Sequence, residues 1–470
     1  MSPSHPRLRL TVIGAGYLGL THAVCMAHLG HDVLALDVDE NKVARAAQGQ
    51  APFFEPGLEP LLRKNLEAGR LRFTNSFAEA GAFGDVHFLC VGTPQAADGS
   101  ADLSYVYAAA DALAPHLSRR CVIAGKSTVP VGTARRLAAR IGARIGAHAM
   151  AGAAGAYPMA GGGTAEPGGA GEPGEAGPEM AWNPEFLREG FAVQDSLSPD
   201  RLVFGVTSQQ AAQALRQVYA QPIAQGAAEV VTDLETAELV KVSANAFLAT
   251  KISFINAMAE VCEAVGADVL SLARALGHDS RIGARFLGPG LGYGGGCLPK
   301  DVRAFRATAR ELGIDSVAAI LTEVDAVNLR RRARTVDLAR DAAGGSLAGC
   351  RVAALGAAFK PNSDDVRDSA SLDVCGRMAA EGAIVTVHDP VAIQKAAAVQ
   401  PALRYANSAL AAAADADVVL HLTEWPEYRL IEPDKLGAVV ARRNMVDARC
   451  VLDGPRWRSA GWSFRLLGGS

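Results

Sequence analysis

Residues 8–37 read LRLTVIGAGYLGLTHAVCMAHLGHDVLALD, and this stretch decides the fold of the first part of the chain. Its apolar beginning, residues 8–13, has the length and composition of a strand buried in a parallel sheet. Gly14, Gly16 and Gly19 follow at once, and glycines at this spacing let the backbone turn tightly beside a pyrophosphate. A glycine turn alone is weak evidence for nucleotide binding, but a strand before it and a helix after it predict a dinucleotide-binding unit.

The rest of the same stretch completes this unit and indicates the cofactor. A helix is expected over 20–29 with Gly30 as its C-cap, and a second strand over 32–37. Asp37 ends this strand 18 residues after the last glycine, where a carboxylate can accept hydrogen bonds from an adenosine ribose. Because the same carboxylate would repel a 2′-phosphate, the sequence favours NAD over NADP.

Composition excludes several classes of protein. The 470 residues are 49% apolar and 20% charged, with a net charge of −3, which predicts a globular protein without a general preference for nucleic acid or acidic membranes. The start MSPSHPRLRL has no apolar signal core and no membrane-spanning apolar run follows, so we expect a cytoplasmic protein. The eight cysteines form no CxxC pair and no metal-like spacing, which favours reduced thiols and no metal site.

Strands alternate with helical segments in two blocks of the chain. In the first block, predicted strands over 86–91 and 121–124 end in polar loops, which bind ligands in doubly wound sheets but are equally often ordinary turns. The second block has predicted strands over 351–355, 384–389 and 418–423. It lacks the full glycine fingerprint, so we expect no second NAD there.

A long helix is predicted between the two blocks. Residues 232–235 (TDLE) read as a capping box at its start, and Gly266 ends it. Lys241 and Asn245 lie four residues apart, so that both side chains can point into one site. We therefore expect an α/β fold of two Rossmann-like doubly wound domains joined by a long central helix.

The expected domains are 1–230, 231–330 and 331–470, of which the first binds NAD and the second contains the long helix and a dimer contact. Residues 146–181 are mostly Gly, Ala, Pro and Glu, and we expect them to form a flexible surface insertion in the first domain.

The run GYGGGCLPKD, residues 292–301, contains the residues that carry chemistry. It presents Cys297 in a glycine-rich loop, with Lys300 close enough to favour the thiolate and Asp301 beside it. A nicotinamide cofactor together with a presented thiol indicates oxidation of an aldehyde through a covalent thioester. The other seven cysteines read as buried, inert thiols.

Seven motifs in order resemble the UDP-glucose/GDP-mannose dehydrogenase family over nearly the whole chain outside the insertion. They are GAGYLG (14–19), FFEPGL (53–58), KSTVPVGT (126–133), NPEFLREG (183–190), NAFLATKISFIN (245–256), GYGGGCLPKD (292–301) and FKPNSDDVRDS (359–369).

The resemblance implies a four-electron oxidation of a sugar C6 alcohol to a carboxylate, with two NAD used in turn and Cys297 as the nucleophile. The stretch NAFLATKISFIN is similar to the branch that acts on UDP-glucose, with GDP-mannose or a UDP-N-acetylhexosamine as the alternatives. Residues 331–470 would then bind the UDP-sugar. A one-step β-hydroxyacid dehydrogenase needs no thiol, so the cysteine loop argues against it. An NAD-binding regulatory protein with a dead site is disfavoured by the intact catalytic set.

The family also implies roles for other residues. Lys241 and Asn245 would stabilise the charge that develops on O6. Asp301 would orient the lysine or the hydrolytic water, and Thr128 with Glu185 would transfer protons through a water. Cofactor contacts are implied for Gly14, Gly16, Tyr17, Leu18, Gly19, Asp37, Lys42, Thr93, Thr128, Glu189, Lys300 and Arg367.

Substrate contacts follow from the same resemblance, with Lys360 and Arg449 supplying positive charge to a diphosphate. Arg281 would reach into the site of a neighbouring subunit, which implies at least a homodimer. The substrate-binding residues so implied are Glu185, Phe186, Leu187, Arg188, Lys241, Asn245, Arg281, Phe286, Leu287, Gly288, Gly290, Gly294, Lys360 and Arg449.

The chain departs from the family pattern in a few places. Gly296 stands where the family usually has Ser, which would loosen the cysteine loop, and Leu298 replaces a commoner aromatic residue. The insertion just before Asn183 would lie near the substrate side and alter access to it. None of these departures removes a catalytic group.

Overall fold

The computed structural model describes residues 7–117, 119–154 and 177–469, which divide into two compact units. Unit 1 comprises residues 1–96 and 101–242, and unit 2 comprises residues 97–100 and 243–470. Among the residues that the structure describes, no helix is both long enough and apolar enough to cross a bilayer.

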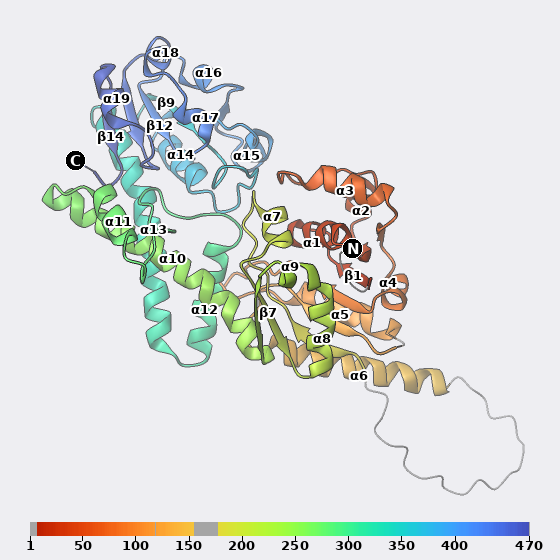
Figure 1. Cartoon of the computed structure of the whole chain (residues 1–470). Helices are drawn as coiled ribbons and strands as arrows, with labels where there is room; N and C mark the ends of the chain where they lie inside the picture. Colours follow the sequence, from red (N-terminus) through yellow and green to blue (C-terminus); the bar gives the residue numbers. More distant parts are fainter. Residues whose placement is uncertain (1–6, 118, 155–176, 470) are drawn as a thin grey trace, which may run out of the picture. The chain divides into compact units, whose positions relative to one another are not determined.

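Unit 1 is built on an eight-stranded sheet in the order β3-β2-β1-β4-β5-β6-β7-β8 (Figure 1). The sheet is parallel except that β6 and β7 run antiparallel, and the order 3-2-1-4-5-6 is that of a doubly wound Rossmann sheet. Its strands are β1 (Arg9–Ile13), β2 (Asp32–Leu36), β3 (Leu71–Thr74), β4 (Val86–Leu89), β5 (Val122–Gly125), β6 (Glu179–Trp182), β7 (Arg201–Val206) and β8 (Ala228–Thr232).

Helices cover both faces of this sheet, because alternate strand residues point to opposite faces and both faces are apolar. On β5, Ala124 packs with α1, α3 and α8, whereas Ile123 packs with α5, α6 and the start of α10. The helices are α1 (Tyr17–His28), α2 (Glu40–Ala47), α3 (Leu58–Glu67), α4 (Phe77–Phe83), α5 (Ser104–Leu113), α6 (Thr133–Ala154), α7 (Ala192–Leu197), α8 (Gln209–Val218), α9 (Ala220–Ala224) and α10 (Leu234–Val265), with a short 3₁₀ turn at Ala114–His116.

Unit 2 contains a second parallel sheet in the order β11-β10-β9-β12-β13-β14, which repeats the strand order of the first (Figure 1). Both sheets therefore have the predicted α/β doubly wound architecture. The strands are β9 (Arg351–Leu355), β10 (Ile384–His388), β11 (Arg404–Tyr405), β12 (Val418–His421), β13 (Asn444–Asp447) and β14 (Ser463–Leu466).

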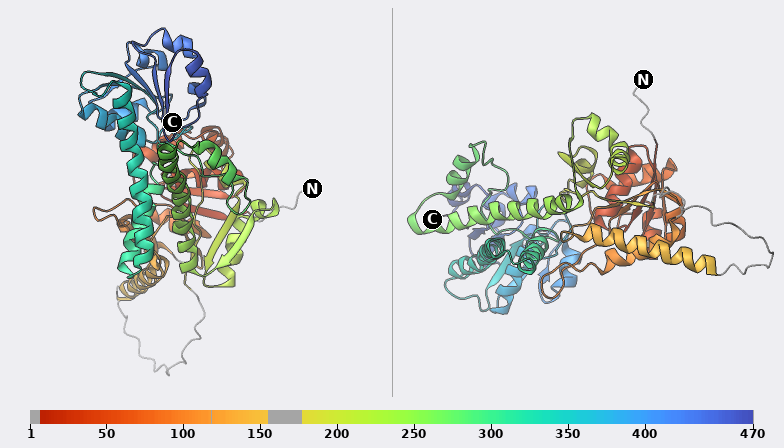
Figure 2. Two further views of the ribbon diagram at one scale, coloured as in Figure 1. Left: turned by 90° about the vertical axis from the view of Figure 1, so that its left-hand side faces the viewer. Right: turned by 90° about the horizontal axis from the view of Figure 1, so that it is seen from below.

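The remaining part of unit 2 is helical. The portion of α10 from residue 243 onward packs along α13, where Ala249 shares an apolar cluster with Leu321 and the Ser253 hydroxyl donates to the carbonyl of Val324 (Figure 2). The other helices of unit 2 are α11 (Val269–Gly277), α12 (Leu298–Glu311), α13 (Asp315–Ala342), α14 (Ala370–Ala380), α15 (Ile393–Val399), α16 (Ala409–Ala413), α17 (Pro426–Arg429), α18 (Pro433–Gly437) and α19 (Gly454–Ser459).

Two predicted helix starts were wrong by a few residues. Helix α1 begins at Tyr17, not at residue 20, because extended Gly16 is already its N-cap. Helix α10 is capped by Asp233, whose carboxylate accepts from the amide of Thr236 at 2.7 Å, and not by Thr232, which ends β8. The predicted long helix itself is confirmed, because α10 has 32 residues and ends just before Gly266.

The predicted insertion over 146–181 was too wide at both ends. Helix α6 continues to Ala154, because the alanine-rich residues after 146 have high helix propensity, and β6 begins at Glu179. Residues 155–176 of the insertion lie outside the described residues.

Buried Asp447 holds together the carboxyl ends of β12 and β13. Its carboxylate lies 2.8 Å from Nδ1 of His421 and accepts four backbone amides, those of residues 449–452. Burial by itself would raise the pKa of Asp447, but the hydrogen bonds from His421 and the backbone outweigh it and lower that pKa.

Replacing Asp447 by Ala should lower the free energy of unfolding of unit 2 by about 3–5 kcal/mol, because the partners of a buried charge are left unsatisfied. Urea unfolding can be followed by the fluorescence of Trp425, Trp457 and Trp462, which lie in the core of unit 2. Asp434→Ala is the control, because exposed Asp434 makes only a 3.7 Å ion pair with Arg443 and should change stability by less than about 1 kcal/mol. Equal effects of the two substitutions would contradict this role of Asp447.

Candidate active site

The glycine turn after β1 in unit 1 forms a cradle for a phosphate group. A Cβ atom on Gly19 would lie 1.7 Å from the carbonyl oxygen of Gly14, so the helix can approach the turn only without a side chain there. A Cβ atom on Gly16 would meet nothing within 4 Å, which leaves open space at the N-terminus of α1. The exposed amides and the positive end of the helix dipole at this place suit a pyrophosphate.

Asp37 follows β2 next to this turn, as the sequence predicted. Its carboxylate is buried and accepts from the amides of Ala15 and Asp39 at 2.7 and 2.9 Å. A carboxylate has about four lone-pair sites, so two hydrogen bonds leave capacity for ribose hydroxyls. The Nζ of Lys42 lies 4.0 Å from the same carboxylate and 3.7 Å from that of Asp39.

Glu55 ties the cofactor turn to a distant motif, and the sequence analysis did not single it out. Its buried carboxylate accepts from the hydroxyl of Tyr17 and from the amides of Gly190 and Ala192, both at 2.7 Å. Burial and the neighbouring carboxylate raise the pKa of Tyr17, so the phenol keeps its proton and donates it. Glu55 lies in the motif FFEPGL. An acidic residue between apolar ones was the only feature of the sequence that could have indicated its role.

The loops after β4 and β5 lie together, with the predicted residues Thr93 and Thr128 in them. The Thr93 hydroxyl donates to the carbonyl oxygen of Thr128 at 2.9 Å, and the Ser127 hydroxyl donates to that of Val91 at 2.6 Å. The two loops therefore support each other at the carboxyl edge of the sheet, where doubly wound sheets bind ligands.

Lys126, two residues before Thr128, is a buried cation that the sequence analysis did not assign to the site. Its Nζ donates to the side-chain oxygen of Asn183 at 2.9 Å and to the hydroxyl of Tyr219 at 3.1 Å. Burial lowers the pKa of Lys126 to about 8. Because Asn183 lies two residues before Glu185, Lys126 links the loops that carry Thr128 and Glu185.

Glu185 and Lys241 form a buried ion pair in unit 1, with Oε1 and Nζ 2.8 Å apart. The other oxygen of Glu185 accepts from the amide of Leu187 at 2.6 Å, and Lys241 also lies over the ring of Phe186. A carboxylate and an ammonium group in contact, of which Lys241 is buried and Glu185 largely buried, can exchange or share protons with a bound alcohol.

The two residues after Leu187 have different environments. Arg188 pairs with Asp195 at 2.6 Å and keeps an exposed side chain, whereas Glu189 is buried.

In unit 2, the side chains of Asn245 and Asp301 are in direct contact. The amide nitrogen of Asn245 donates to Oδ2 of Asp301 at 2.6 Å, and Nζ of Lys300 donates to Oδ1 at 2.5 Å. All of Asp301 is buried, so its charge is balanced locally by Lys300. Asn245 lies one turn after Lys241 along α10, so the helix determines the spacing of these two groups.

Cys297 is the N-cap of α12 and has an exposed side chain, whereas the seven other cysteines are buried. A helix N-terminus stabilises a thiolate through the helix dipole. The loop before it is held tightly: Gly295 has a positive φ of 85°, and a Cβ atom there would lie 2.7 Å from the ring of Phe359. At Gly296 a Cβ atom would meet the guanidinium group of Arg367 at 2.2 Å, so the small residue leaves room for this arginine.

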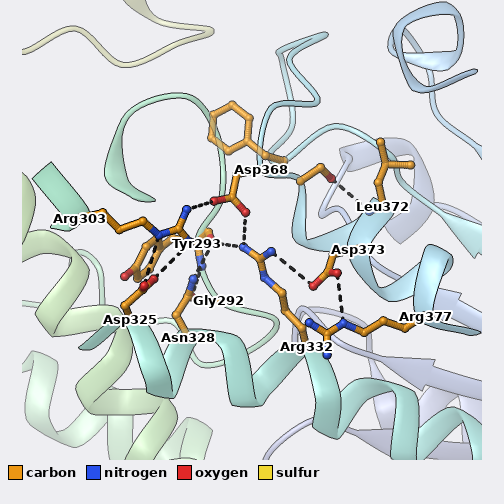
Figure 3. A network of polar contacts seen from close by, with 12 residues as sticks. Gly292, Tyr293, Arg303, Asp325, Asn328, Arg332, Asp368, Leu372, Asp373 and Arg377 are labelled. Carbon is orange, nitrogen blue, oxygen red and sulfur yellow. Dashed lines mark hydrogen bonds and ion pairs between the residues drawn. The ribbon is translucent and has the colours of Figure 1, made fainter. Parts of the chain in front are cut away.

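Three buried polar side chains that the sequence analysis missed anchor the same loop, and two of them, Asn328 and Arg332, are shown in Figure 3. Asn328 accepts from the amide of Tyr293 at 2.8 Å and donates to its carbonyl oxygen at 3.0 Å, and Arg332 also donates to that oxygen. Asn256 accepts from the amide of Gly290 at 2.9 Å. The only signal in the sequence was the position of Asn256 at the end of the motif NAFLATKISFIN.

Arg449 supports the loop from the sheet of unit 2. Its guanidinium group donates to the carbonyl oxygens of Leu422, Gly292 and Phe359 at 2.6, 3.1 and 3.3 Å. Its Nε also lies 3.3 Å from the carboxylate of Glu424, so part of its five donors is occupied by the backbone and this carboxylate and the others can serve an anion. Lys360 lies over the ring of Phe359, and Arg367 pairs with Asp365 at 2.5 Å.

The loop from Phe286 to Gly290 begins with backbone strain. Phe286 has a left-handed φ of 64°, which is rare for a bulky residue and occurs most often at functional sites. Leu287 is buried in a cluster with α10 and α11, and Gly288 is open on the side where a side chain would stand. Arg281 lies before this loop with a side chain that is 87% exposed and paired with Asp279.

The structure therefore brings the predicted residues together in two groups, one in each unit. In unit 1 they are Gly14, Gly16, Tyr17, Leu18, Gly19, Asp37, Lys42, Thr93, Thr128, Glu185, Phe186, Leu187, Arg188, Glu189 and Lys241; in unit 2 they are Asn245, Arg281, Phe286, Leu287, Gly288, Gly290, Gly294, Cys297, Lys300, Asp301, Lys360, Arg367 and Arg449.

Models of three protein domains match the chain in order. They are described as the NAD binding domain, the central domain and the UDP binding domain of the UDP-glucose/GDP-mannose dehydrogenase family, and they match residues 8–223, 235–330 and 353–454.

Individual proteins are similar over nearly the full length. The UDP-glucose 6-dehydrogenase of Rhizobium meliloti (strain 1021) is 39% identical over 464 residues, 98% of this chain and 99% of that protein. The UDP-glucose 6-dehydrogenase TuaD of Bacillus subtilis (strain 168) is 38% identical over 98% of this chain and 93% of its own length. The solved structure of a UDP-glucose dehydrogenase from Pyrobaculum islandicum has a TM-score of 0.87 and 36% identity, with both chains covered completely.

The buried ammonium group of Lys126 should make stability depend on pH. A lysine of the unfolded chain has a pKa of about 10.4, so above pH ~8 the unfolded chain binds more protons and Lys126 adds stability as the pH rises. The free energy of unfolding of the wild type relative to Lys126→Met should therefore increase by about 2 kcal/mol between about pH 7.5 and pH 9.5.

Urea unfolding at a series of pH values measures this difference, with Lys395→Met, an exposed lysine of unit 2, as the matched control. A difference between wild type and Lys126→Met that stays constant over this range would contradict a buried ammonium group at this position.

Proposed function

This chain belongs to the UDP-glucose/GDP-mannose dehydrogenase family, and on that basis we propose that it oxidises UDP-glucose to UDP-glucuronate. It is an NAD-dependent dehydrogenase, with an NAD binding domain and a UDP binding domain of that family. UDP-glucose as the substrate is supported by relatives named UDP-glucose 6-dehydrogenase that are 35–39% identical over nearly the whole chain. GDP-mannose or a UDP-N-acetylhexosamine is the alternative substrate.

One observation carries the proposed four-electron chemistry. Cys297 is exposed at the N-terminus of α12, whereas the other seven cysteines are buried. A simple alcohol oxidation uses no thiol, whereas oxidation of an aldehyde to an acid proceeds readily through a thioester. A thiolate is the nucleophilic form, and the helix N-terminus favours it.

The residues around the glycine turn fit NAD. The space beside Gly16 and the amides at the start of α1 suit its pyrophosphate, and the carboxylate of Asp37 suits its adenosine ribose. Thr93, Lys42, Glu189 and further residues named by the resemblance would complete the cofactor site. Bound NAD supplies a hydride acceptor for each of the two oxidations.

The first oxidation converts the sugar C6 alcohol to an aldehyde. The hydroxyl proton passes through a water to the Glu185 carboxylate, with Thr128 holding that water, as the hydride leaves C6. The ammonium group of Lys241 and the amide of Asn245 stabilise the negative charge on O6. The 2.8 Å contact of Lys241 with Glu185 supports a shared proton at this place.

The second oxidation uses the thiol. The thiolate of Cys297 attacks C6 of the aldehyde and gives a thiohemiacetal, which loses a second hydride and a proton to become a thioester. A water then adds to the thioester carbon, the C–S bond breaks, and carboxylate and thiol are released. Buried Asp301, in contact with Asn245 and Lys300, would orient the groups that hold O6 and the hydrolytic water.

We further propose that the UDP moiety is bound by the arginine and lysine side chains of unit 2, with Lys360 and Arg449 facing the diphosphate. Arg449 retains donors beyond those that hold the backbone, which supports this role. The glycine-rich loop around Gly288, Gly290 and Gly294 would allow close approach of the sugar.

A homodimer or larger oligomer is proposed on the basis of α10. Phe247, Phe254 and Val261 recur every seven residues on this helix and are 66%, 49% and 51% exposed, which is unusual for apolar side chains of this size. Phe254→Glu should therefore convert the protein to monomers in analytical ultracentrifugation, because a charge would be buried in the contact. Leu430→Glu, at an isolated exposed position, is the control. A monomeric wild type would contradict the proposal.

The chemistry is tested by the amount of NADH released per UDP-glucose consumed. The wild type should release two NADH per sugar, whereas Cys297→Ser should stop after at most one, because the thioester cannot form. Cys350→Ala removes a buried cysteine and should still give two NADH per sugar.

One NADH per sugar from the wild type would overturn the four-electron proposal in favour of a one-step dehydrogenase. No turnover of UDP-glucose together with turnover of GDP-mannose or a UDP-N-acetylhexosamine would overturn the proposed substrate and leave the chemistry in place.

A further inference from the structure

We propose that Asp368 is a positioning residue that sets the reactivity of Cys297 by fixing both the loop before it and the helix after it. The inference rests on the proposed function in taking Cys297 as the nucleophile. It concerns a carboxylate that lies outside the predicted site and contacts neither the substrate-binding nor the cofactor-binding residues through its side chain.

The carboxylate of Asp368 bridges two helices (Figure 3). Its Oδ2 accepts from Nη1 of Arg303 on α12 at 3.0 Å, and its Oδ1 accepts from Nη2 of Arg332 on α13 at 2.8 Å. Arg332 is almost completely buried, so its charge needs a partner at this distance. Arg303 lies six residues after Cys297 in the helix that Cys297 caps, and the bridge therefore locks α12 against α13.

The backbone of Asp368 supports the loop before Cys297. The carbonyl oxygen of Arg367 accepts from the amide of Gly295 at 3.0 Å. A Cβ atom on Gly294 would lie 2.4 Å from the carbonyl oxygen of Asp368. The backbone of the cysteine loop therefore packs directly against the backbone at Asp368. The position of residues 294–296 thus depends on where Asp368 is held.

The conformation of Asp368 shows that its surroundings hold it in place. Its φ is +44°, in the left-handed region, which is uncommon for any residue with a side chain although aspartate tolerates it better than most. Such a conformation persists where the neighbouring contacts over-determine it, and it clusters near active sites. Here the two arginine contacts determine it.

The charges around the bridge predict what its loss would do. Arg303 would keep Asp325 at 3.2 Å, but buried Arg332 would keep only Asp373 at 3.4 Å and a carbonyl oxygen. Removing the charge of Asp368 therefore leaves Arg332 under-neutralised and loosens the segment at Asp368 that contacts the cysteine loop, while Arg303 still ties α12 to α13 through Asp325. The thiol would then leave its optimal place at the helix N-terminus.

The test compares Asp368→Asn with Asp373→Asn. Asparagine has the shape of aspartate and tolerates the left-handed backbone, so the first substitution removes the charge and one of the two bridging acceptors without changing the size of the side chain. Asp373 contacts the same Arg332, and also Arg377, but not the cysteine loop, which makes it a matched control (Figure 3). The readout is the second-order rate constant for alkylation by iodoacetamide in the native full-length protein, where the exposed Cys297 reacts and the seven buried cysteines do not.

Asp368→Asn should lower this rate constant at neutral pH by roughly two- to fivefold, the range that a helix N-terminus contributes to an anion. Asp373→Asn should leave it within the error of the wild type, even where both substitutions lower the melting temperature equally. Equal alkylation rates for wild type and Asp368→Asn, or an equal fall for both substitutions, would overturn the proposal.

A second variant covers the case in which Asp368→Asn does not fold. Arg303→Gln removes the α12 end of the bridge together with the contact of Arg303 with Asp325, and leaves the pair of Arg332 and Asp368 intact, so it should lower the alkylation rate at least as much. An unchanged rate there would also overturn the proposal. Because alkylation needs no substrate, failure of this inference is distinct from failure of the four-electron oxidation, which the NADH yield of the wild type measures.

Discussion

A row of buried polar side chains along α10 contacts several of the segments that carry the proposed catalytic groups. Glu238 accepts from the amides of Gly132 and Ala134, both at 2.6 Å, and burial raises its pKa to about 7. Lys241, Asn245 and Asn256 follow at helical spacing, and each makes a short polar contact of its own. One residue of slip would turn each side chain by about 100°, so α10 has one register that satisfies all of them.

Three buried charged side chains, Lys241, Asp301 and Arg332, are each held by an opposite charge. Lys241 with Glu185, Lys300 with Asp301 and Arg332 with Asp368 are each in contact at 2.5–2.8 Å. Such pairs add little net stability, because the cost of removing both charges from water offsets their attraction. What they do provide is a fixed orientation of both side chains, because separating the two charges would leave the buried one without a partner. The pairs thus act as geometric constraints on groups whose placement relative to a reacting atom must be precise.

The fold was predictable from local patterns, whereas part of the candidate site was not. The glycine turn, the βα alternation and the length of α10 are all encoded in residues close together in the sequence, and the structure has them. The N-cap of α10 was misplaced because Thr232 and Asp233 are both good caps, and only the end of β8 decides between them. Glu55 and Asn328 were missed because each acts on backbone far away in the chain, and spacing carries no sign of that.

The two sheets show why strand order alone does not decide what binds. In unit 1, Asp37 accepts from Ala15 and Asp39 and faces the open glycine turn. At the equivalent place in unit 2, Asp389 accepts from the amides of Ala357, Ala358, Val391 and Ala392 and from the indole of Trp425. Five donors saturate that carboxylate and tie up the turn amides that would otherwise face a phosphate. The same architecture therefore leaves the turn after the first strand open to a pyrophosphate in one sheet and occupies the amides of the equivalent turn in the other, so that a nucleotide in unit 2 would be held by other groups.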